Sequence, residues 1–235
     1  MSPGFPRDQL RTRYDVSSFF EDDWHAYSGE RTLEVLHRYL SPESRGPRSL
    51  LNAGSGIYKL ALSGWTEITL DLFTAPLTDG LSAVCGSVER LPFKARCFSA
   101  VVCVGEVLGY CDPAATLAEF SRVLVSKGML IFDFGSSRSF RHLLKRSYGR
   151  AADIVIDQYN WTPEKVWIYD PRYIEALLSS LDFHVEAILG THSWSSLARR
   201  FGVRQRKALS LEKAFKNTSI LKTWADVKTI VAVKT

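Results

Sequence analysis

The sequence lacks a long uncharged apolar run. No stretch in its 235 residues approaches the roughly 18 apolar residues that a membrane-spanning helix needs. The segment from Met1 to Asp15 also has no apolar run followed by a small-residue cleavage site, as a secretory signal would. We therefore expect a cytoplasmic protein without an integral membrane segment. Its length and 46% hydrophobic content suit a single domain over residues 1–235.

Cysteine is scarce, and its spacing does not suit a metal site. The four cysteines, at positions 85, 97, 103 and 111, form no C-x-x-C pair and have no histidine at zinc-finger spacing. This pattern argues against zinc and against a disulfide framework, so we expect no bound metal. Cys85 and Cys103 lie inside apolar runs, which predicts that both pack as small core residues.

Positive charge is concentrated in two places. Residues 138–150 contain five basic side chains and no acid, and residues 195–216 contain seven against one glutamate. Because the whole chain has a net charge of only +5, the remainder is acidic. A basic surface on an acidic body suggests an anionic partner, although charge runs are often only solvated faces.

The first basic stretch has a helical pattern of apolar residues. In SFRHLLKRSYGR, residues 139–150, one helical face would carry Phe140, Leu143, Leu144 and Tyr148. Such a helix could contact an anionic membrane peripherally, flank a phosphate-bearing substrate or pack on its own sheet. RNA would use such cations too, with stacking aromatics nearby, so nucleic acid is a further but less favoured partner.

Short apolar runs alternate with helical patterns along the chain. Strands are predicted at residues 49–53, 67–71, 82–86, 100–104, 129–134, 184–189 and 228–233, and helices at residues 32–40, 113–125 and 171–181. Strands that alternate with helices indicate βαβ units and a mostly parallel sheet. The fold class is therefore α/β, a three-layer sandwich.

Three segments fall outside this alternation. Residues 136–163 and 193–224 are longer than ordinary connections and contain the basic stretches, so we expect insertions above the sheet on the substrate side. Residues 1–30 form an N-terminal segment rich in aromatic and acidic side chains. We expect it to pack over the sheet edge or the site, with Tyr14 and Trp24 as either a lid or ordinary packing.

A glycine turn follows the first strand. In SLLNAGSGIY, Gly54 and Gly56 stand at the carboxyl end of that strand, where open α/β sheets bind ligands. Glycine lets the backbone turn sharply beside a ligand, and a following helix would offer its free amides. A dinucleotide fingerprint would need a third glycine where Lys59 stands, which argues against a nicotinamide or flavin enzyme.

An acidic residue ends the second strand. Asp71 follows Gly54 by 17 residues and closes the segment TEITLDLF. Its carboxylate could accept two hydrogen bonds from a ribose diol, and it could equally cap a helix. Two further segments follow, GSVERLPF at 86–93 and RVLVSKGMLIF at 122–132.

These motifs occur in a familiar order. LLNAGSG, LDLF, GSVERLPF and RVLVSKGMLIF resemble the motifs of class I S-adenosylmethionine-dependent methyltransferases, in particular the small-molecule type 11 branch, over about residues 36–135. The resemblance implies a Rossmann-like sandwich whose seven-stranded, mostly parallel sheet has an antiparallel last strand. It also implies S-adenosylmethionine as cofactor and a small acceptor, anionic or linked to lipid or sugar, methylated at O, N or C.

The resemblance also implies cofactor-binding residues. The methionine and ribose side would be lined by Asn52, Ala53, Gly54 and Gly56, and by Val104 and Gly105 further along. Asp71 would hold the ribose and Leu72 would face the adenine, whose edge would meet Ser87 and Val88. Asn52, Ser87 and Tyr58 depart from the family pattern. These departures leave open a methyltransferase-like domain that binds cofactor or RNA without turnover.

Three residues are candidates for chemistry at the acceptor. Methyl transfer needs an aligned nucleophile, and a base only when that nucleophile carries a proton. Glu106 and Tyr110 follow the fourth predicted strand, and His192 follows the sixth. His192 could deprotonate an acceptor or be a structural histidine, and Glu106 could instead supply charge at a helix N-terminus.

Overall fold

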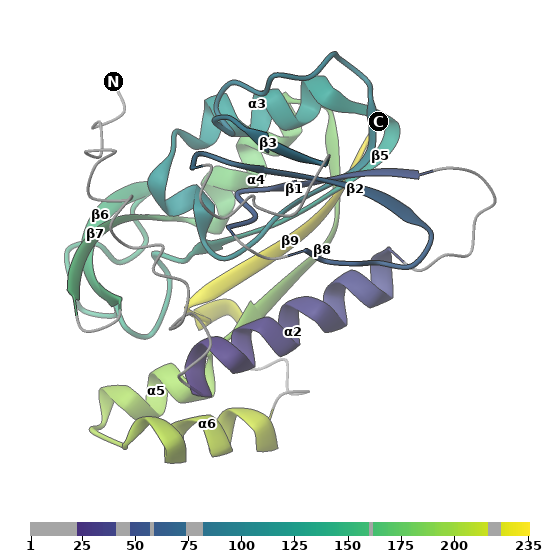
Figure 1. Cartoon of the computed structure of the whole chain (residues 1–235). Helices are drawn as coiled ribbons and strands as arrows, with labels where there is room; N and C mark the ends of the chain where they lie inside the picture. Colours follow the sequence, from purple (N-terminus) through teal and green to yellow (C-terminus); the bar gives the residue numbers. More distant parts are fainter. Residues whose placement is uncertain (1–22, 41–47, 57–58, 74–81, 160–161, 216–221) are drawn as a thin grey trace.

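The computed structural model describes residues 23–40, 48–56, 59–73, 82–159, 162–215 and 222–235. A seven-stranded sheet forms the centre of the fold (Figure 1). Its strands are β1 (Arg48–Ala53), β2 (Trp65–Asp71), β3 (Ala83–Cys85), β4 (Phe98–Cys103), β5 (Leu124–Gly135), β8 (Phe183–Thr191) and β9 (Val227–Lys234).

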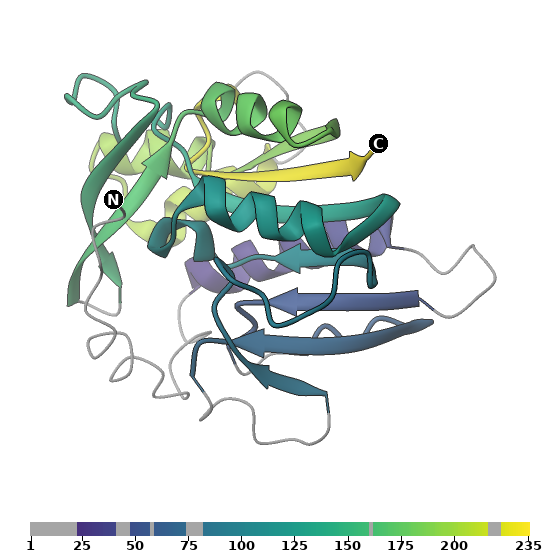
Figure 2. The same cartoon turned by 90° about the horizontal axis from the view of Figure 1, so that it is seen from above.

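The strand order is β3-β2-β1-β4-β5-β9-β8, and β1 to β5 pair in parallel (Figure 2). β9, the last strand, runs antiparallel to both β5 and β8. The predicted sheet is therefore confirmed, including its antiparallel last strand. Since the parallel strands end at one edge, the loops that follow β1, β2, β3, β4 and β5 meet there.

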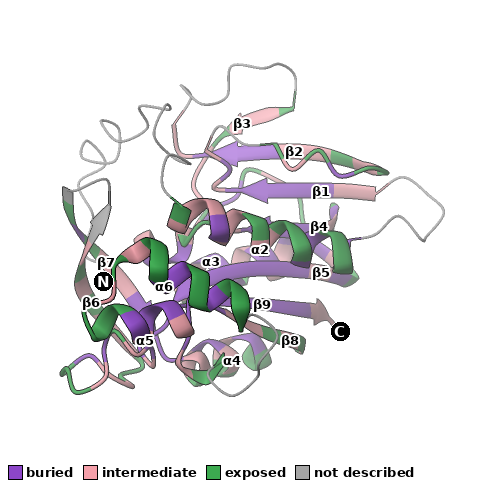
Figure 3. Cartoon of the chain, turned by 90° about the horizontal axis from the view of Figure 1, so that it is seen from below, coloured by how far each residue is buried: buried purple, intermediate pink, exposed green. Residues whose placement is uncertain are grey.

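Helices cover both faces of the sheet. One face packs against α3 (Pro113–Val123) and α4 (Pro171–Ser180), and the other against α2 (Asp23–Tyr39) (Figures 1 and 3). Alternate residues of β5 serve the two layers: Phe132 joins the α3 and α4 side, and Ile131 joins the α2 side. The three-layer prediction is confirmed.

The start of α3 follows from its sequence. The carboxylate of Asp112 accepts hydrogen bonds from the amides of Ala114 and Ala115 at 2.8 and 3.2 Å. Pro113 occupies the first helical position, where a missing N–H costs nothing. The apolar spacing then buries Leu117 and Phe120, so the prediction of a helix that begins at Pro113 is confirmed.

The expectation of a helix directly after the glycine turn is wrong for the part that the structure describes. Only residues 54–64 connect β1 to β2, and the described ones, 54–56 and 59–64, are not helical. The chain must return roughly 17 Å along five strand steps at about 3.3 Å each. An α-helix would spend about 11 residues on that distance, which leaves none for the turns.

The predicted helix over residues 139–150 is also wrong. This segment is a series of turns, with His142 N donating to Ser139 O and Lys145 N to His142 O. The hydroxyl of Ser139 accepts from the amide of Arg141 at 3.0 Å, a local bond that competes with helix formation. Leu144 then takes a left-handed φ of 69°, which breaks the helical pattern.

An antiparallel hairpin that sequence patterns did not reveal begins in the same expected insertion and extends beyond it to Tyr169. β6 (Ala152–Tyr159) pairs with β7 (Thr162–Tyr169), and Ser136 bridges to Tyr169. The Tyr169 hydroxyl lies 3.1 Å from Leu108 O and 3.3 Å from Cys111 O, at either end of the short helix η2 (Val107–Tyr110). The hairpin is thereby held beside the strand ends.

The described part of the second expected insertion is largely helical. It contains α5 (Trp194–Arg200), α6 (Gln205–Ala214) and the short helix η3 (Lys222–Trp224), and α6 contacts α2 (Figure 1). None of the helices in the described residues is long and apolar enough to cross a lipid bilayer.

The two cysteines expected in the core differ. Cys103 is buried in β4, as predicted, but Cys85 is exposed. Cys85 belongs to β3, which pairs with β2 alone and forms the edge of the sheet. An apolar run in an edge strand is covered less completely than one in a central strand, so the core prediction for Cys85 is wrong.

Candidate functional site

The loops after the first three strands are joined by hydrogen bonds. The Asp71 carboxylate, at the end of β2, accepts from the amides of Gly56 at 2.8 Å and Phe73 at 3.1 Å. Gly54 N donates to Leu70 O at 2.7 Å, and Gly86 N donates to Asp71 O at 2.8 Å. Asp71 is thus the centre of a single unit formed by three strand ends.

Asp71 retains the capacity to bind a ligand. Burial raises the pKa of its carboxyl, and the amide hydrogen bonds, that of Gly56 first, oppose this shift. A carboxylate can accept about four hydrogen bonds, and the backbone amides of Gly56, Phe73 and Leu72 already act on this one. Asp71 is only 2% exposed, so it has capacity for about one further donor while it still holds the glycine turn.

Gly54 cannot readily be replaced. Its φ is +69°, and a Cβ built on it would lie 2.6 Å from Cγ2 of Val107. A side chain there would both strain the backbone and push against η2. The turn therefore brings the end of β1 into contact with the helix that follows β4.

This contact gives a prediction for stability. Gly54→Ala should cost about 2 to 4 kcal/mol of unfolding free energy, from left-handed strain and overpacking together. Gly105→Ala is the matched control, because Gly105 has a φ of +90° but a Cβ there would meet nothing within 4 Å. Urea denaturation should rank Gly54→Ala as the worse variant, with partial recovery when Val107→Ala is added. Equal losses at the two glycines would contradict the packing argument.

Other predicted cofactor residues flank the same unit. Ala53 is buried at the end of β1, and Leu72 is half-buried directly after Asp71. The hydroxyl of Ser87 accepts from the amide of Glu89 at 3.2 Å, and Val88 is buried. The structure therefore gathers these predicted positions at the carboxyl edge of the sheet.

Asn52 has a different neighbourhood from the one that the motif implies. Its Nδ2 donates to Oε1 of Glu67 at 2.9 Å. The same carboxylate accepts from the amides of Leu60 and Ala61, both at 2.9 Å. Asn52 and Glu67 together fasten the non-helical connection to β1 and β2. Sequence reasoning missed Glu67, whose only signal is its position in β2 close to the glycine turn.

A second carboxylate organises the end of β4. Asp133 of β5 is buried and accepts from the amides of Gly105 at 3.1 Å and Glu106 at 2.7 Å. Gly105 and Glu106 both have left-handed φ values, 90° and 57°. Burial raises the pKa of Asp133 to about 6, and its two amide partners oppose the shift. Asp133 was not predicted as a site residue from sequence, although it lies near the end of β5, directly after the motif that ends at Phe132.

Glu106 lies beside this carboxylate. The residue is accessible to solvent, but its carboxyl lies among protein atoms, with Oε2 only 3.0 Å from where a Cβ on Gly135 would stand. Burial, followed by the negative charge of Asp133, raises the pKa of Glu106 to about 8, and Arg141 opposes the shift. A glutamate whose pKa lies near neutral pH can accept or donate a proton at ordinary pH.

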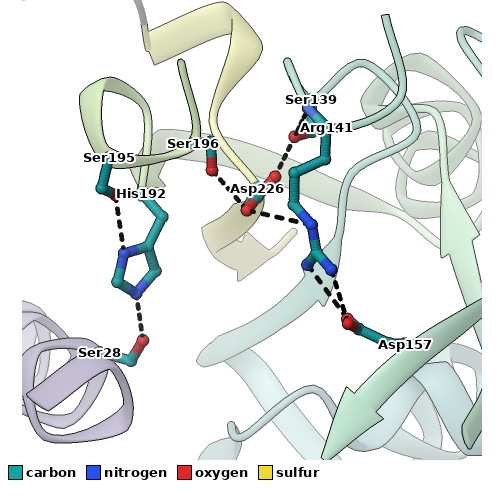
Figure 4. A network of polar contacts seen from close by, with 8 residues as sticks. All are labelled: Ser28, Ser139, Arg141, Asp157, His192, Ser195, Ser196 and Asp226. Carbon is teal, nitrogen blue, oxygen red and sulfur yellow. Dashed lines mark hydrogen bonds and ion pairs between the residues drawn. The ribbon is translucent and has the colours of Figure 1, made fainter. Parts of the chain in front are cut away.

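Tyr110 and His192 differ in their access to the site. Tyr110 is half-buried at the end of η2, close in sequence to Glu106. His192 is fully buried, and its Nε2 lies 2.8 Å from Ser28 Oγ while its Nδ1 lies 3.2 Å from Ser195 Oγ (Figure 4). Trp24 stacks on its ring with centroids 3.7 Å apart. Both ring nitrogens are engaged, so His192 joins α2 to the start of α5.

The remaining predictions concern metals and the N-terminal segment. Among the described residues, no group of three or more His, Cys, Asp or Glu side chains is arranged to hold a metal ion. Trp24, which is half-buried, packs on His192 at the α2 interface, while Tyr14 lies outside the described residues.

Comparison with known families gives a match over the centre of the chain. Residues 52–132 match the family described as "Methyltransferase domain". A malonyl-[acyl-carrier protein] O-methyltransferase from Herminiimonas arsenicoxydans is 42% identical over 69 residues. That match spans 29% of this chain and only 26% of the relative's length.

Solved structures are similar over nearly the whole chain. A S-adenosylmethionine-dependent methyltransferase from Clostridium acetobutylicum is 12% identical with a TM-score of 0.60, covering 97% of this chain and 98% of that one. The 1,6-didemethyltoxoflavin-N1-methyltransferase of Burkholderia thailandensis, solved with 1,6-didemethyltoxoflavin and S-adenosylhomocysteine, is 18% identical with a TM-score of 0.57. That comparison covers 98% of this chain and 91% of the other. At these identities the likeness establishes the fold.

Proposed function

The chain carries a methyltransferase domain with the class I fold, and from this premise we propose that it transfers a methyl group from S-adenosylmethionine to a small acceptor. One observation carries the proposal: the glycine turn, Asp71 and the β3 end form a hydrogen-bonded unit at the carboxyl edge of the sheet. Ligands of open α/β sheets bind at such an edge. S-adenosylmethionine would supply an electrophilic methyl group on a positively charged sulfur.

The residues present fit this cofactor. Asp71 has acceptor capacity for a ribose hydroxyl beside its backbone partners, and a Cβ on Gly105 would meet nothing within 4 Å, which leaves room beside the β4 end. Asp133, whose pKa is about 6, would provide negative charge near a sulfonium at neutral pH. Asn52 would contribute through its position in β1 rather than through its amide, whose Nδ2 donates to Glu67.

Among the candidate catalytic residues, we assign the proton-accepting role to Glu106. Its carboxyl can be ionised near pH 8, at the edge where the acceptor would approach. Tyr110 would help to shape the acceptor side. His192 receives no proton-transfer role because it is fully buried and both ring nitrogens have partners.

The acceptor is small, and we further propose that it is anionic. Two basic segments stand at the same edge of the molecule, and the partially matching relative from Herminiimonas arsenicoxydans is named for methylating a malonyl group on a carrier protein. The atom that receives the methyl group depends on the acceptor. A domain that binds cofactor without turnover is the weaker alternative, since Glu106 has the titration range of a base.

Calorimetry tests the cofactor directly. The purified protein should bind both S-adenosylmethionine and S-adenosylhomocysteine at micromolar concentration and should not bind NAD. Binding of NAD alone would favour a nicotinamide enzyme. Failure of both sulfur ligands to bind would overturn the proposal.

The role of Asp71 gives a sharper measurement. Asp71→Asn should weaken S-adenosylmethionine binding by about 1.5 to 3 kcal/mol, the scale of a hydrogen bond to a charged group. Glu119→Gln is a matched control, because this carboxylate on α3 also accepts a backbone amide, that of Leu91 at 2.6 Å. Its affinity for the cofactor should be unchanged. Equal affinities for the Asp71 variant and the wild type would remove the ribose assignment.

A further inference from the structure

The two basic segments meet around one pocket. Its volume is about 350 Å³, and it is lined by Arg141, Lys145, Ser196, Arg199 and Arg200. The first two residues come from the turns after β5, and the other three come from α5. Segments more than 50 residues apart therefore bring four cationic side chains to the same hollow.

A buried aspartate holds these segments together. Asp226 accepts hydrogen bonds from the hydroxyls of Ser139 and Ser196, one from each segment (Figure 4). Arg141 lies 3.8 Å from Asp226 and also makes contacts of 3.1 and 2.6 Å with the two oxygens of Asp157 on β6. The walls of the pocket are thus fixed by charged and polar contacts.

The pocket has more positive side chains than the two aspartates can neutralise. Asp157 and Asp226 both pair with Arg141, so the four positive charges of the pocket are set against two negative charges, and a net charge of two remains. Within the described residues, Lys145, Arg199 and Arg200 have no ion pair. Arginines also suit the last turn of a helix such as α5, but that preference does not explain their convergence with Arg141 and Lys145.

The pocket adjoins the proposed methyl-transfer site. Ser136, directly after β5, donates its amide to Asp226 O at 2.7 Å, and Glu106 lies against Gly135, the residue before Ser136. The charges of Arg141, Asp157 and Asp226 also act on Glu106: Arg141 lowers its pKa, and the two carboxylates raise it. A group held in the pocket would therefore lie close to the carboxyl of Glu106, to which we assign the proton-accepting role.

We infer that this pocket binds a phosphate monoester, either on the acceptor itself or on a lipid headgroup. A monoester carries a charge of about −1.5 to −2 at neutral pH, which matches the uncompensated charge. Guanidinium groups suit its oxygens because they can donate two parallel hydrogen bonds. The volume is at the small end of the range for ligand sites, about 300 to 1,000 Å³, so it admits one such group with a short attachment.

We include a lipid as a source of the phosphate monoester because two exposed apolar residues adjoin pocket-lining residues in the sequence. Leu144 precedes Lys145 and is 89% exposed, and Phe201 follows Arg200 and is 78% exposed. These are the two most exposed large apolar side chains of the described residues. Either an amphiphilic acceptor or a membrane surface would cover them.

The test uses methyl phosphate as the probe and dimethyl phosphate as the diester control. Chemical-shift titration should give at least tenfold tighter binding for the monoester. The double variant Arg199→Gln with Arg200→Gln should lose at least tenfold in affinity for methyl phosphate. Arg206→Gln with Lys207→Gln removes the same charge from exposed positions of α6 outside the pocket and should change it less than twofold.

Each outcome separates the possibilities. Binding of phosphatidate vesicles that methyl phosphate displaces would identify a lipid source, and absence of vesicle binding alongside monoester binding would identify a soluble one. No binding of methyl phosphate, equal losses in both double variants, or equally tight binding of the diester would overturn the inference. The inference rests on the proposed function only for the acceptor role. S-adenosylmethionine affinity, which the pocket variants should leave unchanged, tests that function separately.

Discussion

Replacing Glu106 with glutamine should lower the rate of methyl transfer by about 100- to 10,000-fold for an acceptor that must lose a proton, the usual worth of a positioned base. Glutamine keeps the size of the side chain but cannot accept the proton. Turnover can be followed as formation of S-adenosylhomocysteine. An unchanged rate would show that the chemistry depends on alignment alone and would remove the base assignment.

The titration of Glu106 can be measured without an acceptor. Carbon-13 NMR of labelled glutamate should show one carboxyl that titrates near pH 8, absent from Glu106→Gln. Asp133→Asn should move that midpoint downward, because the charge of Asp133 raises the pKa of Glu106. A glutamate that titrates near its ordinary value of 4.5 would contradict the raised pKa and the influence of Asp133 on it.

The same shift predicts how stability changes with pH. The folded protein retains the Glu106 proton up to about pH 8, whereas the unfolded chain releases it near pH 4.5. Between these values the folded state binds more protons, so the contribution of Glu106 to stability falls as pH rises. Glu106→Gln should lose this dependence. Its unfolding free energy relative to wild type should therefore increase between pH 5 and pH 8.5.

The fold was predictable because its signals are local and repeated. The strand ending at Asp71 and the helix beginning at Pro113 each follow from apolar spacing and a polar residue at the boundary. The conformation of the connection after β1 was not predictable from the glycine motif, because the motif does not specify how many residues separate β1 from β2. Only the register of β2 against β1, with Trp65 beside Arg48, shows that a helix would not fit.

The part of the candidate site that could be predicted from sequence consists of motif residues at or near the ends of strands. Gly54 follows β1, Asp71 is the last residue of β2 and Glu106 lies three residues after β4, so a parallel sheet brings them to one edge. Asp133 supports Glu106 from a strand 27 residues away, and its partners are backbone amides that leave no residue pattern. Residues 139–150 were predicted to be a helix and are turns instead. These turns likewise depend on distant contacts, such as the hydrogen bond from Phe140 N to Trp224 O.

Asp226 is the residue whose removal should damage the structure most. Asp226→Ala should lower the unfolding free energy by about 3 to 5 kcal/mol, as expected when one partner is removed from a buried charged network. The variant would leave the buried hydroxyls of Ser139 and Ser196 without their acceptor and would remove one of the two carboxylates beside Arg141. Urea denaturation measures the loss.

Replacing Asp226 with asparagine keeps the shape of the side chain and removes its charge, so it separates the two contributions to stability. Asp226→Asn can still accept from one serine hydroxyl and can donate to the other, so the cluster remains paired. Burial raises the pKa of the Asp226 carboxyl, which means that its ionised form costs folding free energy, and losing that charge offsets part of the lost attraction to Arg141. We therefore expect Asp226→Asn to cost less than about 1.5 kcal/mol, within the range for a single hydrogen bond.

Asp157→Asn, a substitution at the more exposed partner of Arg141, should cost about 1 kcal/mol or less. If Asp226→Ala were as stable as wild type, the cluster could not be what holds the two basic segments together, and the pocket between them would need another explanation.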